Sequence, residues 1–486
     1  AAGEAGAVDE AIAKFEALQT RFANSTSDQV QLMVADGGVR ASDLYVQTGN
    51  IDTALAKAED ARDRSVRTGD VVQKVQAQYQ VANLRSRQAR ALFDNTEGSA
   101  NTAYKQASRE SVQDYLKVAE FAEPIAQAPQ NARVFVGPAL YQAGVVSYAV
   151  HGPVDLPISA EVLPRFVQLS DNGHITASAE EIQTALYYAG VTMYDLARGS
   201  EMDPTLFAAS AEHLQGLVNR YPTNEDAGLW QYQVGEAFFA AQRFEEALPA
   251  YIAVPDNYPT HASAAEALYS AAACYNNVGR PDEVFGVYER LASNYPESEY
   301  AADAFISVGD ARYNETIELA EDDPVRIVKL KEALALYKSV LELESASEQS
   351  KHTVLTYIEE TEEALAALEY GTIETAFNAA LSAIGGADVT PAQTQAVLDA
   401  LADFNTLTET YPGSESMQVA LVQMGDGYVQ LERWQDAINT FGRLTAFYTD
   451  ASGIRVTPPN PNLDRALRRA ETQIVEIGRA SCRGRG

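Results

Sequence analysis

The sequence predicts an all-α fold, a solenoid of stacked helical hairpins with irregular insertions, and two observations support this. A Tyr-Pro step occurs at Tyr221, Tyr258 and Tyr295 with a constant spacing of 37 residues, and Tyr411-Pro412 is followed by Tyr448 after the same interval. Between these steps, small and aromatic residues return at fixed offsets with a helical period. A constant period of this length indicates a repeat architecture rather than one compact core.

Each repeat is predicted to hold a first helix and a second helix that pack closely. Gly235 and Ala247 are small enough for close approach, and Tyr251 fills the space between hairpins. Pro259 ends the hairpin, because the residue before a proline is driven out of the helical region. Thr260 is the predicted cap of the next helix. Tyr258 is therefore expected to be buried at the joint, and Tyr295, Pro296 and Ser298 are expected to repeat these roles.

The pattern Val234-Gly235-x2-Phe238, then Ala247-x3-Tyr251, then Pro259 resembles the tetratricopeptide repeat. The resemblance is specific between Ala208 and Tyr448 and weaker upstream. It implies a right-handed superhelical solenoid that associates with other proteins. The Tyr-Pro-x-Ser form of the repeat is similar to that of bacterial envelope proteins, which implies export.

In chain order, the elements form five predicted segments. Residues 1–130 hold divergent helical repeats, and residues 131–200 continue them with an irregular insertion at 151–178, where prolines and an Asn172-Gly173 turn favour loose structure or a β-hairpin. Residues 201–345 hold regular repeats, including a late second helix begun by Asp323-Pro324. Residues 346–477 hold further repeats, interrupted by a loop near 385–388, and residues 478–486 are expected to be a non-native or disordered tail.

The composition excludes several classes of partner. Acidic residues outnumber basic ones by 68 to 36, and the net charge of −32 repels nucleic acids and anionic membranes. Two cysteines cannot form a disulfide framework. The start Ala1-Ala2-Gly3, without Met, fits a mature exported product, although a shortened sequence would look the same. We therefore expect a periplasmic, envelope or extracellular location.

No stretch of the sequence carries a catalytic or metal-binding motif such as H-E-x-x-H, G-x-S-x-G, C-x-x-C or a phosphate-binding loop. The segment around Gly173 fails as a calcium loop because Gln168 and Ala179 would occupy its first and last ligand positions. Ser178 and Glu181 form a capping box instead. We therefore predict no enzyme, no cofactor and no specific metal site; weak divalent-cation binding to the acidic surface is a further prediction. An enzyme hidden in 151–178 is the least favoured alternative.

Partner binding is expected on the inner face, which the first helices line. Fixed offsets in the repeat place acidic and aromatic residues there, and no lysine: Tyr232, Glu236, Phe239, Glu266, Tyr269, Asn276, Asp303, Ile306, Asp310 and Tyr313. By charge complementarity, a ligand would be extended, partly apolar and neutral or basic. The competing interpretation is a solvated acidic face with no ligand.

The sequence favours self-association as the function, because a solenoid exposes an apolar face at any uncapped end. The second-type helix 8–22 has no first-type helix before it, and the helix 462–477 has no second-type helix after it. A head-to-tail contact between them would propagate as an extracellular or envelope filament. Its predicted interface comprises Val8, Ile12, Phe15, Leu18, Leu463, Leu467 and Ile474. The alternative is a monomeric envelope adaptor whose groove binds a different protein.

Overall fold

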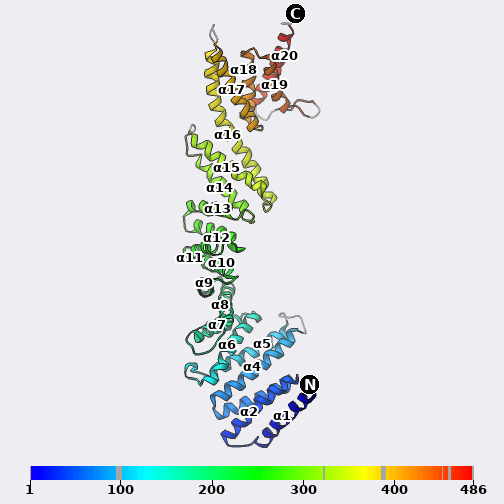
Figure 1. Cartoon of the computed structure of the whole chain (residues 1–486), viewed down its shortest axis with the longest axis vertical. Coiled ribbons are helices and arrows are strands. Elements are labelled where there is room, and N and C mark those ends of the chain that lie inside the picture. The colour runs from blue at the N-terminus through cyan, green and yellow to red at the C-terminus, as the bar shows by residue number, and fades with distance from the viewer. Residues whose placement is uncertain are drawn as a thin grey trace. The chain divides into compact units, whose positions relative to one another are not determined.

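The computed structural model describes residues 2–94, 101–320, 323–384, 390–450, 453–457 and 461–483. The predicted all-α fold of stacked helical hairpins is confirmed: within these residues the chain is almost entirely helical, and the extended pairing is one β-bridge between Thr449 and Arg455. Two compact units are present, Ala1–Gly279 and Arg280–Gly486, and Figure 1 labels their helices in chain order. None of the described helices is both long enough and apolar enough to cross a bilayer.

The first unit is a series of helices in which each packs on the next. Neighbouring even-numbered helices from α2 to α8, and α10 with α12, also contact each other, so the even-numbered helices are the first helices of successive hairpins. The elements are α1 (Ala2–Arg21), α2 (Asp28–Gln47), α3 (Ile51–Thr68), α4 (Val71–Asp94), α5 (Thr102–Phe121), η2 (Ile125–Gln127), α6 (Gln130–Val150), α7 (Leu156–Asp171), α8 (Ala179–Gly199), α9 (Pro204–Arg220), α10 (Ala227–Ala240), α11 (Phe244–Asn257) and α12 (Ser263–Asn277).

The second unit continues the same alternation, with contacts between α14 and α16, α16 and α18, and α18 and α20. Its elements are η3 (Pro281–Glu283), α13 (Val284–Asn294), α14 (Ala301–Glu315), α15 (Pro324–Glu342), α16 (Glu348–Ala383), α17 (Pro391–Thr410), α18 (Glu415–Gln430), α19 (Trp434–Phe447) and α20 (Pro461–Arg483). The proline-started helix is confirmed, since Asp323 Oδ1 accepts a hydrogen bond from the Val325 N–H at 2.9 Å. The loop predicted near 385–388 lies outside the described residues.

Small residues and rings pack the hairpins as the repeat pattern predicts. A Cβ added at Gly235 would lie 2.5 Å from the Tyr251 ring, and one at Gly309 would lie 2.5 Å from the Tyr337 ring. Real Cβ atoms do not approach a ring so closely, so each glycine is required where the second helix presents its aromatic residue. The predicted close helix contacts at both glycines are confirmed.

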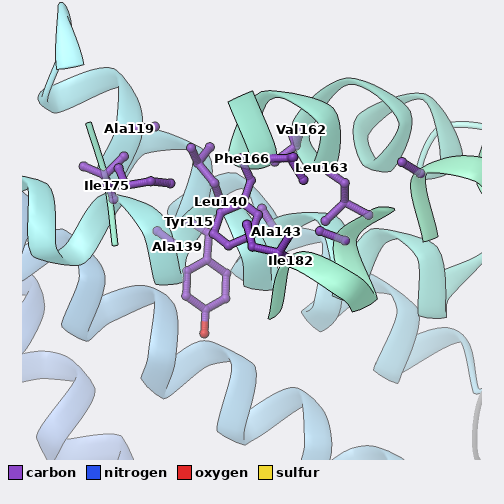
Figure 2. Close-up of a cluster of buried hydrophobic side chains, with 14 of the residues drawn as sticks. Tyr115, Ala119, Ala139, Leu140, Ala143, Val162, Leu163, Phe166, Ile175 and Ile182 are labelled. Atoms are coloured by element: carbon purple, nitrogen blue, oxygen red, sulfur yellow. The ribbon is translucent and has the colours of Figure 1, made fainter. Parts of the chain in front are cut away.

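The prediction of loose structure or a β-hairpin within 151–178 is wrong, because residues 156–171 form α7. Pro157 stands in the first turn of α7, where a helix tolerates proline. Leu163 and Phe166 then supply a buried face, which packs with Leu140 in the cluster of Figure 2. Gly173, at φ +70°, follows the end of α7. Burial of these apolar side chains thus stabilises a helix, and the Asn172-Gly173 turn follows its last residue.

The caps at the Tyr-Pro joints differ from the predicted ones. Thr260 is not a cap, because the chain first turns, with the His261 N–H donating to the Tyr258 carbonyl oxygen, and α12 begins only at Ser263. The Nδ1 atom of His261 accepts the Ser263 N–H at 3.1 Å. Ser298 accepts the N–H of Tyr300, just before α14, and is not its N-cap residue.

Four tyrosines at the joints, three of them followed by proline and Tyr448 by Thr449, are buried to different degrees. Tyr258 and Tyr295 are partly buried, whereas Tyr411 and Tyr448 are only 4% and 9% exposed. All four follow the last residue of a second helix. The joint is therefore a shared position whose burial depends on the neighbouring hairpins.

The tail prediction needs one correction. Residues 478–483 are not disordered, because α20 continues past Ile477 to Arg483. These residues contain no proline, and alanine and arginine are good helix formers, so one glycine at 478 is tolerated. A non-native origin of the segment stays a prediction.

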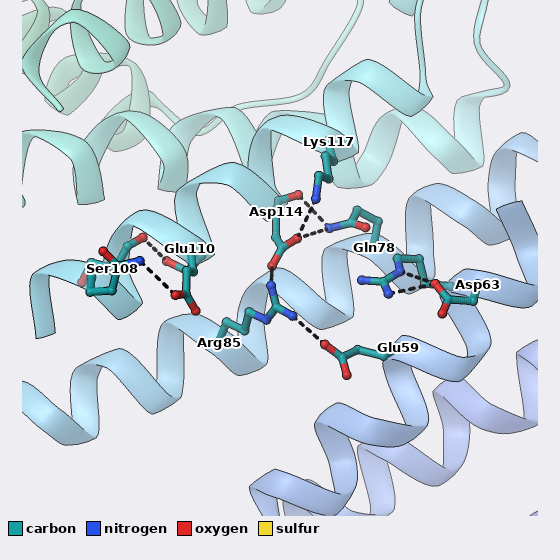
Figure 3. A network of polar contacts seen from close by, with 11 residues as sticks. Glu59, Asp63, Gln78, Arg85, Ser108, Glu110, Asp114 and Lys117 are labelled. Atoms are coloured by element: carbon teal, nitrogen blue, oxygen red, sulfur yellow. Dashed lines mark hydrogen bonds and ion pairs between the residues drawn. The ribbon is translucent and has the colours of Figure 1, made fainter. Parts of the chain in front are cut away.

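Ion pairs accompany the most deeply buried carboxylates of the first unit. Asp114 of α5 is 1% exposed and lies 2.6 Å from Arg85 of α4, which also reaches Glu59 of α3 at 2.6 Å (Figure 3). Asp155, before α7, is 2% exposed and pairs with Arg109 of α5 at 2.8 Å. Because an unpaired buried charge is costly, these arginines allow the fold to hold the carboxylates.

Candidate functional site

On two first helices, the carboxylate that follows the contact glycine accepts a hydrogen bond from a tyrosine of the second helix. In α10, Glu236 Oε1 accepts a hydrogen bond from the Tyr251 hydroxyl of α11 at 2.6 Å. In α14, Asp310 Oδ1 accepts one from the Tyr337 hydroxyl of α15 at 2.8 Å. In both hairpins the second helix thus supplies the ring that packs on the glycine and the hydroxyl that binds the acid.

The surroundings of these acids are partly desolvated. Burial, and then the charge of Glu236, raises the pKa of the Tyr251 phenol well above its ordinary range, so the phenol remains a donor at neutral pH. Burial and the carboxylates of Glu236 and Glu266 raise the pKa of Tyr232 in the same way. Burial also raises the pKa of Asp310 above that of an ordinary aspartate, although the Tyr337 hydrogen bond opposes this.

A cavity of about 340 Å³ opens between first helices of the first unit, and we call it the acid–tyrosine cavity. It is lined by Tyr148 of α6, Val191, Tyr194 and Asp195 of α8, Leu214 of α9, and Gln233 and Glu236 of α10. A cavity of about 250 Å³ in the second unit has related chemistry. We call it the second-unit cavity, and it is lined by Asp310, Tyr313, Asn314, Tyr337, Tyr357, Glu360 and Thr361.

The predicted inner-face residues fall into two groups, one in each unit. In the first unit, Tyr232 and Glu236 lie close enough to Glu266 for all three to interact electrostatically. Phe239 packs edge-on against Phe244, with ring centroids 5.1 Å apart, Tyr269 on α12 is partly buried, and Asn276 is exposed. In the second unit, Asp310 and Tyr313 line the second-unit cavity, Ile306 is partly buried and Asp303 is exposed.

Of the residues that line the acid–tyrosine cavity, sequence analysis selected Glu236 alone. It missed the aliphatic Val191 and Leu214 and four aromatic or polar residues, Tyr148, Tyr194, Asp195 and Gln233. A signal for the two tyrosines existed, because the offset that leads from Gly235 to Phe239 leads from Gly144 to Tyr148 and from Gly190 to Tyr194. Asp195 and Gln233 occupy no position selected by the repeat. Only the packing of α6, α8 and α10 brings them to one cavity.

The residues predicted for a head-to-tail contact pack, to a large extent, within their own units. Ile12 is 8% exposed and Leu467 is 1% exposed. Leu18 and Phe15 lie against Gly37 of α2. Val8 is partly buried, Ile474 packs partly buried against the second-unit core, and the side chain of Leu463 lies outside the description. The contact itself stays a prediction.

Metal and thiol chemistry receive no support from the described residues, in which no three His, Cys, Asp or Glu side chains are grouped to hold a metal. Cys274 of α12 is fully buried. Burial, and then Glu236, raises the pKa of its thiol to about 12, so the thiol stays protonated. The capping box of Ser178 and Glu181 is confirmed at the start of α8.

Comparison with known proteins agrees with a tetratricopeptide-like repeat. Residues 266–298 match the tetratricopeptide repeat family, and no curated protein matches the chain. A tetratricopeptide repeat protein from Parabacteroides merdae ATCC 43184 is 14% identical, with a TM-score of 0.26, over 59% of this chain and 99% of that one. The TPR domain of P58(IPK) is 12% identical, with a TM-score of 0.22, over 91% and 98%. A circular tandem repeat protein is 14% identical, with a TM-score of 0.21, over 94% and 99%.

Proposed function

We propose that this chain is a non-catalytic scaffold that binds a different protein through the face formed by its first helices. Repeats of this type serve protein–protein interaction, and the observation that favours this face is its unmatched negative charge. Among the described residues, neither Glu236 nor Asp310 forms an ion pair with a lysine or arginine, although both side chains are partly buried. Asp114 and Asp155, in contrast, each have an arginine.

The partner segment is an extended stretch of neutral or basic character. Carboxylates next to tyrosines offer hydrogen-bond acceptors and apolar rings together, and a basic segment would satisfy both. A solvated acidic face is the competing explanation. Partial burial of Glu236, Tyr194 and Asp310 in the linings of cavities argues against it, because a solvated face would leave them in open water.

Fluorescence anisotropy with labelled extended peptides tests this function. Basic peptides should bind the full chain and lose affinity as salt rises, because added ions screen the attraction. Acidic peptides of the same length should not bind. A variant carrying Glu236→Gln and Asp310→Asn should bind basic peptides less tightly than one carrying Glu225→Gln and Glu245→Gln, which neutralises two exposed acids of the first unit. Equal binding of basic and acidic peptides would refute the proposal.

Self-association is a second candidate, and a surface near α1 supports it. A cavity of about 560 Å³ is lined in part by Phe15, Leu18, Leu32 and Met33, and Met33 is 59% exposed. Light scattering of the wild type at high concentration should show assemblies that Met33→Asp disperses. The matched control Met202→Asp changes a methionine that is 56% exposed. A wild type that stays monomeric would remove this candidate.

Export belongs to the same proposal, and its support is the Tyr-Pro-x-Ser form of the repeat. Cell fractionation followed by immunodetection should place the protein in the envelope, the periplasm or the medium. Detection of all the protein in the cytosolic fraction would contradict this location.

A further inference from the structure

The acid–tyrosine cavity combines two carboxylates with two tyrosine rings. Its volume of about 340 Å³ lies at the small end of the roughly 300–1,000 Å³ typical of ligand pockets. That size suits one long side chain better than a cofactor. Asp195 and Glu236 supply the charge, and Tyr148 and Tyr194 supply aromatic surface.

Among the described residues of the first unit, neither carboxylate forms an ion pair with a lysine or an arginine. Asp195 has a histidine nearby, with its Oδ2 atom 3.7 Å from His151 Nε2, and it forms no ion pair with lysine or arginine. Glu236 receives the Tyr251 hydroxyl and no cation. The cavity therefore presents two carboxylates, which a donor with several N–H groups would satisfy.

The second unit shows which donor fits a carboxylate at this position. Gly425 and Asp426 of α18 stand in the repeat where Gly235 and Glu236 stand in α10. Arg469 of α20, the next first helix, places its Nη2 atom 2.7 Å from Asp426 Oδ2. In α12, the next first helix after α10, the side chains at this place are the carboxylate of Glu266 and the protonated thiol of Cys274, and neither is a cation.

Arginine over an aromatic ring is also a contact that this chain already makes on its first helices. The Arg243 guanidinium carbon lies 5.1 Å from the centroid of Phe238, and that of Arg433 lies 5.3 Å from Tyr428. Such stacking adds to charge pairing, since the ring face attracts a cation. A guanidinium has five N–H donors in a planar fork, enough to bind two carboxylates at once, whereas an ammonium has three.

We propose that the acid–tyrosine cavity receives a single arginine side chain of the partner protein, whose guanidinium pairs with Asp195 and Glu236 and lies against Tyr148 and Tyr194. This assignment rests on the proposed function and names the anchor residue of the partner segment.

The experiment uses the full chain and three glycine–serine heptapeptides with a central arginine, lysine or citrulline. Citrulline keeps the shape of arginine without its charge. The arginine peptide should bind at least tenfold tighter than the citrulline peptide and several-fold tighter than the lysine peptide. With 3-fluorotyrosine in place of Tyr194, the fluorine NMR signal should shift on adding the arginine peptide.

Variants then locate the contact. Asp195→Asn with Glu236→Gln should weaken binding of the arginine peptide at least tenfold, and the matched pair Glu225→Gln with Glu245→Gln should change it less than twofold. Circular dichroism melting confirms that each variant is folded.

Three outcomes would overturn the assignment. One is equal binding of the citrulline or lysine peptide, and another is an equal effect of the two double variants. The third is binding that leaves the signal at position 194 unmoved, and in that case the proposed function survives while this inference fails. If neither the arginine nor the lysine peptide binds, and longer basic peptides also fail, the proposed function falls with it.

Discussion

Two hairpins of the molecule, α10–α11 in the first unit and α18–α19 in the second, follow the same repeat 190 positions apart: Gly235 corresponds to Gly425 and Tyr251 to Phe441. Both turns use a residue in the left-handed region, Gln242 at φ +59° and Glu432 at φ +55°.

The two hairpins differ in how they satisfy the acid that follows the glycine. Glu236 is bound by the Tyr251 hydroxyl. In the second hairpin Phe441 has no hydroxyl to offer, and Asp426 pairs with Arg469 of the next first helix. Two hairpins can therefore share the same backbone architecture and still satisfy the acid after the glycine with different partners. A repeat that leaves its acid without a cation keeps an open position for a ligand, and a repeat that supplies its own arginine closes it.

The largest expected effect on stability comes from deleting the aromatic ring at the repeat position that Tyr251 and Phe441 occupy. Phe441 is fully buried, so Phe441→Ala should lower the free energy of unfolding by about 3–5 kcal/mol through lost burial and a residual cavity. Denaturant titration measures this. The control Phe447→Ala removes a ring that is 51% exposed and should cost far less. A loss below about 1 kcal/mol for Phe441→Ala would show that the ring does not hold the hairpin.

The second-largest expected effect on stability comes from filling the space at Gly425, the glycine that faces the Phe441 ring. A Cβ at Gly425 would lie 2.3 Å from the Phe441 ring, so Gly425→Ala should destabilise by about 1–3 kcal/mol through overpacking. Gly442, on α19, has open space around its Cβ position, and Gly442→Ala should instead stabilise by up to about 1 kcal/mol. Opposite signs for the two variants in thermal melting are the test, and equal signs would contradict the packing argument.

Exchanging the hydroxyl between the hairpins sharpens the comparison. Tyr251→Phe gives the first hairpin the ring of the second and leaves Glu236 without its donor, at a cost of about 1–2 kcal/mol. Tyr337→Phe is the matched change beside Asp310 and should cost a similar amount. If Tyr251→Phe leaves the denaturation midpoint unchanged, water replaces the hydroxyl without loss and the two hairpins are energetically equivalent.

The smallest expected effect on stability comes from breaking the ion pair between Arg469 and Asp426. Arg469 is 58% exposed, so Arg469→Met should lower stability by less than about 1 kcal/mol. Burial already raises the pKa of Asp426 while Arg469 lowers it, so the pKa should rise further in the variant. In that variant the native state holds the proton more tightly than the unfolded chain, so stability falls as pH increases from the unfolded to the folded pKa of Asp426. Carboxyl NMR titration measures the shift, and an unchanged pKa would mean that Arg469 does not neutralise Asp426.

The repeat, its small-residue contacts and its aromatic residues were determined by the sequence alone. Gly235 and Tyr251 recur as Gly425 and Phe441 at the same offset because both hairpins pack by the same local geometry, and a local rule is visible in a linear pattern. The capping box at Ser178 could also be predicted from the sequence, since its donors and acceptors lie within one helical turn.

Tertiary structure decided the rest. Residues 156–171 became a helix because burial of Leu163 and Phe166 outweighed the prolines and the Asn-Gly turn signal. The acid–tyrosine cavity unites α6, α8, α9 and α10, and Asp195 and Gln233 reach it from positions outside the repeat pattern. Whether an acid meets a hydroxyl, an arginine or neither depends on which side chain the neighbouring helix presents. That contact joins residues far apart in the chain, and the period of 37 residues does not encode it.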